Sequence, residues 1–261
     1  MIKRTFILIK RNFKEMIRDP LSYVFCLGFP IIMIILFQVI NRFTNGNTPI
    51  FNNASLIPGI MVFSFTFVML TMALLVSKDK QTALIKRLYI SPVKPFEFIL
   101  SYAFCGFVIG IIQAVLCVFT GFILSLIMQS SYFSFGASIL LILSQLPILL
   151  ICIFLGILFG SLLNDKSAPA VTSIFISASG ILGGAWMPLD TMGGFETFCR
   201  FLPFYPSVYI GRTITGALHT YPSTPYVFDN VAYLGLIPIG IFLILGITFS
   251  VLVFKKQTTT D

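Results

Sequence analysis

Charged residues are scarce in this chain, and that scarcity excludes most soluble folds. Only 10% of its 261 residues are charged, 57% are apolar, and the mean hydropathy is +0.99. A soluble domain of this length needs far more polar surface to stay dissolved. The long apolar runs do not alternate with polar residues, as the strands of a membrane β-barrel would. The sequence therefore predicts an all-α polytopic membrane protein.

The residue patterns that enzymes use are also missing. The chain has one His, and neither an HExxH zinc motif nor a His-containing triad occurs. No GxxxxGK[ST] loop is present to hold nucleotide phosphates, and no paired carboxylates lie inside the apolar runs. We therefore expect no catalytic residue, no metal site and no cofactor in this chain.

Six apolar runs are long enough to cross a membrane, since a hydrocarbon core about 30 Å thick takes roughly 20 helical residues. These predicted spans are Leu21–Ile40, Leu56–Ser77, Phe96–Met128, Phe135–Leu163, Ala168–Leu189 and Val231–Phe254. The third and fourth exceed the required length, so each is expected to tilt or protrude.

The basic residues are divided unequally between the two sides of these spans. Fourteen of the seventeen Lys and Arg lie before the first span, in residues 78–94, at Lys166 or in the tail. Only Arg42, Arg200 and Arg212 fall on the other side. Because cytoplasmic loops are enriched in Lys and Arg, both termini are predicted to be cytoplasmic. The net charge of +8 then reflects topology, and no solvated basic domain remains to bind nucleic acid.

Residues 2–18 are predicted to form an amphipathic helix, which Pro20 ends by disfavouring helix at Asp19. Its apolar residues recur at helical spacing and are Ile2, Phe6, Ile9, Phe13, Met16 and Ile17. Such a helix, ending at Arg18, lies in the inner membrane interface with its apolar stripe against lipid or protein. A basic leader that only sets topology is the alternative.

Residues 82–91 are predicted to form a short cytoplasmic helix between the second and third spans. Its apolar ridge consists of Ala83, Leu84, Leu88 and Ile90, with Lys80, Lys86 and Arg87 around it. Ser91 and Pro92 end this helix, and Pro95 starts the next span. A short rigid helix of this kind suits docking of a soluble partner. A topogenic loop held on anionic lipid head groups is the alternative.

Polar residues inside the spans are few. Gln113 and Gln145 can line a path for substrate, although single Gln residues more often form hydrogen bonds between helices. Ion-coupled carriers usually keep ionisable groups at membrane depth, so their near absence weighs against that class.

Residues 190–230 are predicted to form an external re-entrant segment between the fifth and sixth spans. Four prolines exclude a single helix, and the many Phe and Tyr residues favour the membrane interface. We expect short helices that dip into the outer leaflet.

The order of five motifs resembles that in the permease subunits of type-2 ATP-binding-cassette exporters, which include drug, antibiotic-peptide and polysaccharide exporters. The motifs are IRDP (17–20) followed by GFP (28–30), TALIKRLYISPVKPFEFIL (82–100), GGAWMPLDTM (183–192) and RFLPFYPSVYIGR (200–212). This chain has KDKQTA (78–83) where family members often have a Glu-rich, Gly-Thr lead-in. That departure concerns the detailed pairing with a partner rather than the class.

The resemblance implies a working unit of two permease chains, identical or paralogous, and two cytoplasmic ATPase subunits that hold ATP and Mg. Residues 82–91 would be the coupling helix, and the interfacial helix would move with it. The implied coupling residues are Thr82, Leu84, Lys86, Arg87, Leu88, Tyr89, Ser91, Pro92 and Glu97. The expected location is a bacterial cell membrane.

The substrate is left open by the sequence. Phe-rich spans favour a hydrophobic drug, an antibiotic peptide or a lipid, while polysaccharide or sodium export stays possible. A secondary carrier without an ATPase, and a membrane scaffold or sensor that transports nothing, are the rival functions.

Overall fold

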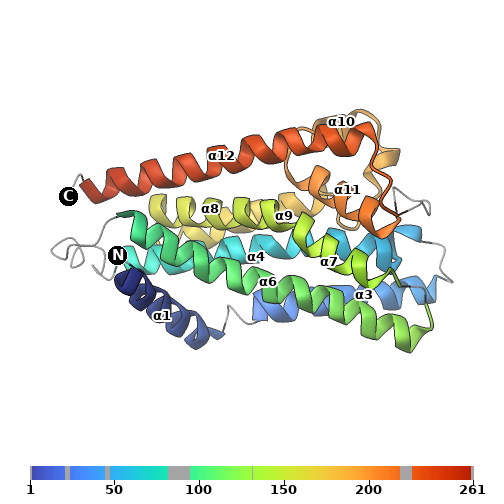
Figure 1. Cartoon of the computed structure of the whole chain (residues 1–261), viewed down its shortest axis with the longest axis horizontal. Coiled ribbons are helices and arrows are strands. Elements are labelled where there is room, and N and C mark those ends of the chain that lie inside the picture. The colour runs from blue at the N-terminus through green and yellow to red at the C-terminus, as the bar shows by residue number, and fades with distance from the viewer. Residues whose placement is uncertain are drawn as a thin grey trace.

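The computed structural model describes residues 2–20, 24–44, 48–81, 95–130, 132–217 and 225–259. These ranges are helices joined by turns, without a strand among them. The long helices run side by side along the longest axis of the molecule (Figure 1). Both chain termini lie at one end, which we call the terminal end, and the opposite end is the far end (Figure 1).

The described elements follow one another in a simple order. They are α1 (Ile2–Arg18), the π-helical turn η1 (Val24–Gly28), α3 (Phe29–Phe43), the 3₁₀ turn η2 (Pro49–Phe51), α4 (Asn53–Gln81), α6 (Pro95–Met128), α7 (Phe135–Ser144), α8 (Leu146–Leu162), α9 (Ala168–Leu182), the 3₁₀ turn η3 (Leu189–Thr191), α10 (Gly194–Cys199), α11 (Phe204–Thr215) and α12 (Asn230–Thr259). In Figure 1, α1 lies at an angle to the bundle at the terminal end, and α10 and α11 lie at the far end.

Five helical stretches in the described ranges are long and apolar enough to cross a membrane. They are Val24–Phe43, Asn53–Gln81, Phe96–Met128, Phe135–Leu162 and Asn230–Lys256. Each overlaps a predicted span. The fourth is divided, because α7 ends at Ser144 and α8 begins at Leu146. Pro147, in the first turn of α8, has no N–H, so it cannot continue the backbone hydrogen bonds of α7.

The predicted fifth span, 168–189, is shorter in the structure. Its helix α9 has 15 residues and is followed by a turn at Gly183 and Gly184. At 1.5 Å per residue α9 is about 22 Å long, less than a hydrocarbon core of about 30 Å. The segment from Asp165 to Ala185 nevertheless lies along α4 between Ser77 and Gly59. Ser77 Oγ lies 3.4 Å from Asp165 Oδ1, just before α9, and Ala185, just after it, touches Gly59.

α4 is the centre of the bundle. Of its most apolar 18 residues 89% are buried, against 17% for α12, which lies at the edge (Figure 1). It contacts α3, α6, α8, α9 and α11. Gly156 and Gly160 of α8 allow the closest approach, since a Cβ on either would lie about 2.5 Å from the backbone oxygens of Met69 and Ala73. These two glycines bound the sequence GILFG (156–160), a GxxxG pattern that permits close packing of helices.

A proline in α4 requires help from α11. Pro58 has no N–H, so it cannot donate to the carbonyl of Ala54 four residues earlier. Thr215 Oγ1 donates to that carbonyl oxygen at 2.6 Å, and Arg212 Nε donates to Ser55 O at 3.1 Å. Inside a membrane a backbone group without a partner costs several kcal/mol, on the order of a lost hydrogen bond. These two side chains therefore fix α11 against the first turn of α4.

We predict that Gly156→Ala destabilises the bundle and that Gly240→Ala does not. The new methyl group at 156 would collide with the α4 backbone, whereas no atom lies within 4 Å of a Cβ at 240. Overpacking of this kind costs about 1–3 kcal/mol. Thermal unfolding of the purified protein in detergent should give a lower Tm for Gly156→Ala only. Equal Tm values for the two variants would show that the α4–α8 contact is looser than described.

Candidate functional site

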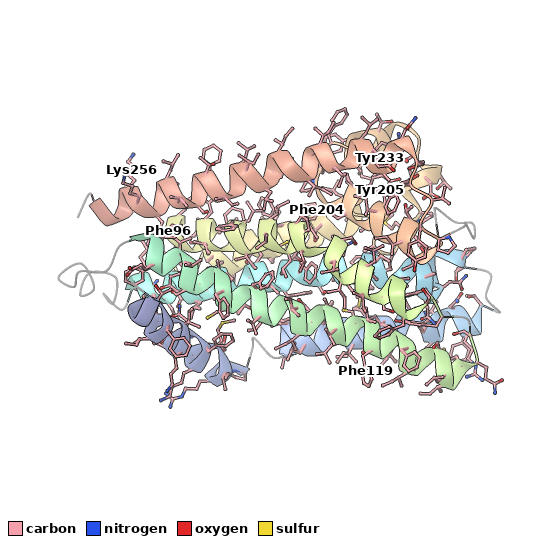
Figure 2. The ribbon with its side chains drawn as sticks, in the orientation of Figure 1. Phe96, Phe119, Phe204, Tyr205, Tyr233 and Lys256 are labelled. Carbon is pink, nitrogen blue, oxygen red and sulfur yellow. The ribbon has the colours of Figure 1, made fainter. Side chains whose placement is uncertain are left out.

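The predicted coupling helix lies outside the described residues. Eight of its nine coupling residues fall there and remain a prediction: Thr82, Leu84, Lys86, Arg87, Leu88, Tyr89, Ser91 and Pro92. The structure does describe the two helices that bound this segment. α4 ends at Gln81 and α6 begins at Pro95, and Phe96 lies at the same end as Lys256 of α12 (Figure 2).

A buried carboxylate joins α1, α4 and α6 beside this segment. Asp79 lies two residues before the end of α4, and its side chain is 3% exposed. Arg11 of α1 donates from Nη1 to Asp79 Oδ2 at 2.7 Å and from Nη2 to Asp79 Oδ1 at 2.5 Å. Tyr102 of α6 donates from its hydroxyl to Asp79 Oδ2 at 2.5 Å. The three side chains, which we call the junction, therefore fix three helices to one another.

A second set of hydrogen bonds supports the junction. Arg11 also donates to Glu15 Oε1 at 2.7 Å and to Asn12 Oδ1 at 3.2 Å. Asn12 is itself buried, and its Nδ2 donates to Ser101 Oγ on α6 at 3.1 Å. The Arg11 guanidinium thus bonds two carboxylates, those of Asp79 and Glu15. The adjacent residue, Asn12, forms a separate contact with α6.

The charges at the junction are matched. Burial lowers the pKa of the Arg11 guanidinium, but the hydrogen bonds and negative charge of Asp79 outweigh burial and raise that pKa above its ordinary value. Arg11 therefore stays protonated at any physiological pH. A bidentate guanidinium–carboxylate pair is both strong and directional. Because Asp79 is buried, removal of either partner would leave a charge with poor solvation.

The ninth coupling residue, Glu97, is described and buried. It stands in the first turn of α6, and within the described part of the chain its Oε2 has no hydrogen-bond partner. The next residue, Phe98, packs its ring 6.3 Å from the ring of Phe254 on α12. The first turn of α6 therefore contacts the end of α12 and carries a buried carboxylate oxygen next to the predicted coupling helix.

The face of α1 that packs on the bundle is rotated about the helix axis relative to the predicted apolar stripe, so the two overlap only in part. Leu8, Asn12 and Met16 are buried, whereas Phe6 is 66% exposed and Ile17 is 61% exposed. Ile9 and Phe13 are partly buried against the core, and Arg18 is exposed. The helix therefore has a contact face and, beside it, an exposed apolar edge that suits lipid.

Gln113 and Gln145 are both fully buried and join separate helices. Gln113 Nε2 donates to Cys26 O of η1 at 2.6 Å and to Ser64 O of α4 at 3.0 Å. Gln145 Nε2 donates to Ser207 O of α11 at 2.9 Å. The Oε1 atoms of both have no partner among the described residues. Their amides hold backbone together at the π-helical turn and at the break between α7 and α8.

A cleft of about 460 Å³ lies between α1 and α4 next to the junction. Its lining includes Met16, Leu75, Asp19, Lys78 and Asp79. No group of three or more His, Cys, Asp and Glu suited to a metal ion occurs among the described residues. The described chemistry at the terminal end is therefore ion pairing and helix contact.

Sequence reasoning missed the junction. The apolar pattern of residues 2–18 gives Arg11 no particular role, and Asp79 lies within the mainly basic stretch KDKQTA (78–83). A signal was present in the sequence, because Asp79 is flanked by Lys78 and Lys80 at the end of an apolar span. A carboxylate that is buried at the end of a membrane span needs a cation beside it, and α1 contains several Lys and Arg residues.

Comparison with known proteins connects this geometry to a family. The family model described as ABC-2 type transporter matches residues 3–215, which include α1, the junction and α11. A search of curated proteins returned no significant match.

We predict that Asp79→Asn destabilises the protein far more than Glu15→Gln. Asn keeps the shape of Asp79 but leaves the Arg11 guanidinium without its buried counter-charge, whereas the Glu15 side chain is 43% exposed. The expected losses are about 2–3 kcal/mol for Asp79→Asn and under about 0.5 kcal/mol for Glu15→Gln. Thermal unfolding in detergent measures both. The double variant Arg11→Gln with Asp79→Asn should recover part of the loss, and strict additivity would contradict a direct Arg11–Asp79 interaction.

Proposed function

The chain belongs to the ABC-2 type transporter family as a membrane-embedded permease, and from that premise we propose that it is the permease of an ATP-driven exporter. ATP hydrolysis takes place in a separate cytoplasmic ATPase, because the sequence contains no phosphate-binding loop of the GxxxxGK[ST] type. The proposed assembly contains two ATPase subunits and a second permease chain. The proposed substrate is a hydrophobic drug, peptide or lipid.

The junction carries the proposal. Residues 82–94 connect α4 to α6, and Asp79 ties the adjoining ends of both helices to α1. A force on this segment would therefore act on three helices at once. Coupling requires the ATPase to bind two permease conformations with different affinity. A coupling helix mounted on a rigid base can have two defined positions, whereas one on loosely attached helices cannot.

The position of α4 supports transmission to the far end. It is buried at the centre of the bundle and contacts α11 as well as α6 and α8. Thr215 and Arg212 bond α11 to the first turn of α4, at the far end. A displacement of α4 along its axis would therefore move α11. We propose this movement as the link between ATPase state and the outer side of the membrane.

The proposed topology is that of a multi-pass protein in a bacterial cell membrane, with six crossings and both termini in the cytoplasm. Support for the sixth crossing comes from α9 and the turn after it, which follow α4 from Asp165 to Ala185. Support for the orientation comes from Lys78, Lys80, Lys166, Lys255 and Lys256, all at the terminal end. The re-entrant segment with α10 and α11 then lies on the outer side, partly in the outer leaflet, with the start of α10 facing water.

We predict that Leu88→Asp with Arg87→Glu prevents association with the ATPase. The double change places a charge in the proposed apolar ridge and reverses a charge at its rim. Co-purification and permease-stimulated ATPase activity are the measurements, with a loss of at least tenfold expected, about 1.4 kcal/mol. The matched control is Lys255→Glu with Lys256→Glu, which lowers the basic charge at the same end. Association that survives the first pair, or that is lost equally in both, would refute docking through this ridge.

The proposed orientation predicts which introduced cysteines react on intact cells. A membrane-impermeant maleimide should label Gly194→Cys, at the exposed start of α10, without permeabilisation. Lys86→Cys should react only after the membrane is opened. The five native cysteines are buried and give a low background. Labelling of Lys86→Cys on intact cells would contradict the proposed orientation.

A further inference from the structure

The side of α1 that is turned away from the bundle is exposed. It lies opposite the buried residues Leu8, Asn12 and Met16, because each residue of an α-helix advances about 100° around the axis. Figure 2 shows side chains with nitrogen at their tips that extend from α1 away from the other helices. We call this side the outer face of α1. It consists of six exposed residues, Phe6, Ile7, Lys10, Lys14, Ile17 and Arg18.

Large apolar side chains occupy one edge of the outer face. Phe6 is 66% exposed and Ile17 is 61% exposed, and both lie on the same edge as Ile9 and Phe13, which are partly buried. Single exposed apolar residues are ordinary on a surface in water. A continuous apolar edge, on a helix beside a membrane bundle, is typical of a helix in the lipid interface. This edge therefore suits acyl chains.

Three cations occupy the rest of the outer face. Lys10, Lys14 and Arg18 are spaced four residues apart, so they follow one another along the helix over about 12 Å. None of them forms a hydrogen bond or an ion pair with the described residues. Arg11 of the same helix differs, because its charge is matched by Asp79.

The charge of the outer face stays positive when the neighbouring carboxylates are counted. Glu15 forms an ion pair with Arg11 at 2.7 Å. Asp19 follows Arg18 and lines the cleft between α1 and α4. If Asp19 is counted in full against the three cations, two positive charges remain.

We propose that the outer face of α1 binds anionic phospholipid head groups of the cytoplasmic leaflet. Lys10, Lys14 and Arg18 meet the phosphates, and Phe6 and Ile17 lie among the upper parts of the acyl chains. The sign fits, because this leaflet carries a negative surface potential that attracts basic segments. Long Lys and Arg side chains can reach head groups from a helix whose apolar edge is in lipid. An acidic protein surface would satisfy the cations but not the apolar edge.

The inference rests on the proposed orientation and goes beyond the proposed export function. Arg11 holds the same helix to Asp79. Lipid on the outer face would act on α1 from the side opposite its contact with the bundle. Lipid charge would thereby help to fix the depth of the junction in the membrane.

Quenching of tryptophan fluorescence by brominated lipids tests which lipids surround α1. The reporter is Phe6→Trp, and the signal of the native Trp186 is measured in the unchanged chain and subtracted. The purified chain is placed in nanodiscs of equal parts phosphatidylcholine and phosphatidylglycerol, with one of the two lipids brominated in its acyl chains. We expect brominated phosphatidylglycerol to quench the reporter at least threefold more strongly than brominated phosphatidylcholine. Equal quenching by the two lipids, or quenching by neither, would overturn the proposal.

A second reporter and a salt series locate the effect. Ile127 is as exposed as Phe6, at 66%, but it lies near the end of α6, at the far end of the bundle (Figure 1). Both leaflets of a nanodisc have the same composition, so Ile127→Trp also meets phosphatidylglycerol and should show no preference. The preference at Phe6→Trp should fall to near one in about 1 M NaCl, where the Debye length is about 3 Å. A preference at both reporters, or one that salt does not change, would contradict binding at the outer face.

Charge variants assign the effect to the three cations. Lys10→Gln, Lys14→Gln and Arg18→Gln together should reduce the preference at Phe6→Trp to near one, because the exposed positive charge is lost. These side chains are exposed and form no bonds with the described residues, so the triple variant is expected to fold. A preference that survives all three changes would refute the assignment.

The matched control is Lys166→Gln with Lys255→Gln and Lys256→Gln. It removes the same charge at the same end of the molecule and should leave the preference at Phe6→Trp unchanged. An equal fall in the control would show that overall charge, and not the outer face, attracts the lipid, and the proposal would be wrong. The assay contains neither ATP nor an ATPase, so its failure would leave ATPase association and stimulation untouched.

Discussion

A charge buried at the end of the central helix is the constraint on which the terminal end depends. Asp79 cannot lie among apolar helices without a cation, and Arg11 reaches it only if α1 lies against α4 and α6. The leader helix is therefore attached to the bundle by a specific pair rather than by lipid alone. Tyr102 completes the arrangement from α6. One carboxylate thus determines how three helices meet beside residues 82–94.

The far end depends on the backbone of α4 and its neighbours. Pro58 leaves the carbonyl of Ala54 without its helical partner, and Thr215 of α11 supplies one. Gln113 plays a similar part at the π-helical turn, where it donates to Cys26 O. Hydrocarbon offers no hydrogen bonds, so each backbone carbonyl that lacks a helical partner needs a polar side chain nearby. Thr215 and Gln113 meet that need. The Thr215 contact also holds α11, the helix that carries Tyr205 and Tyr209, against α4.

Apolar runs and basic flanks were enough to predict the long helices and the amphipathic leader, because hydrophobic length and period are local properties. The break at Gln145 and the short α9 were not predicted, since composition alone does not mark where an apolar run bends. The contact face of α1 includes Ile9, Phe13 and Met16 of the predicted stripe, together with Leu8 and Asn12, which the stripe did not include. Its centre is Asn12, a polar residue whose burial depends on Ser101, 89 positions away. Pairings across such separations arise from packing, and single-sequence patterns do not encode them.

The central claim is that α1, α4 and α6 act as one body at the terminal end, and a disulfide between α1 and α6 tests it most directly. Asn12→Cys with Ser101→Cys replaces two side chains that are in direct contact, since Asn12 Nδ2 now lies 3.1 Å from Ser101 Oγ. The background is Cys105→Ser, because Cys105 also contacts α1. The measurement is permease-stimulated ATPase activity before oxidation, after oxidation and after reduction. The account predicts that stimulation is retained in the cross-linked protein. Stimulation that is lost on oxidation and restored by reduction would show that α1 must move against α6, and would contradict it.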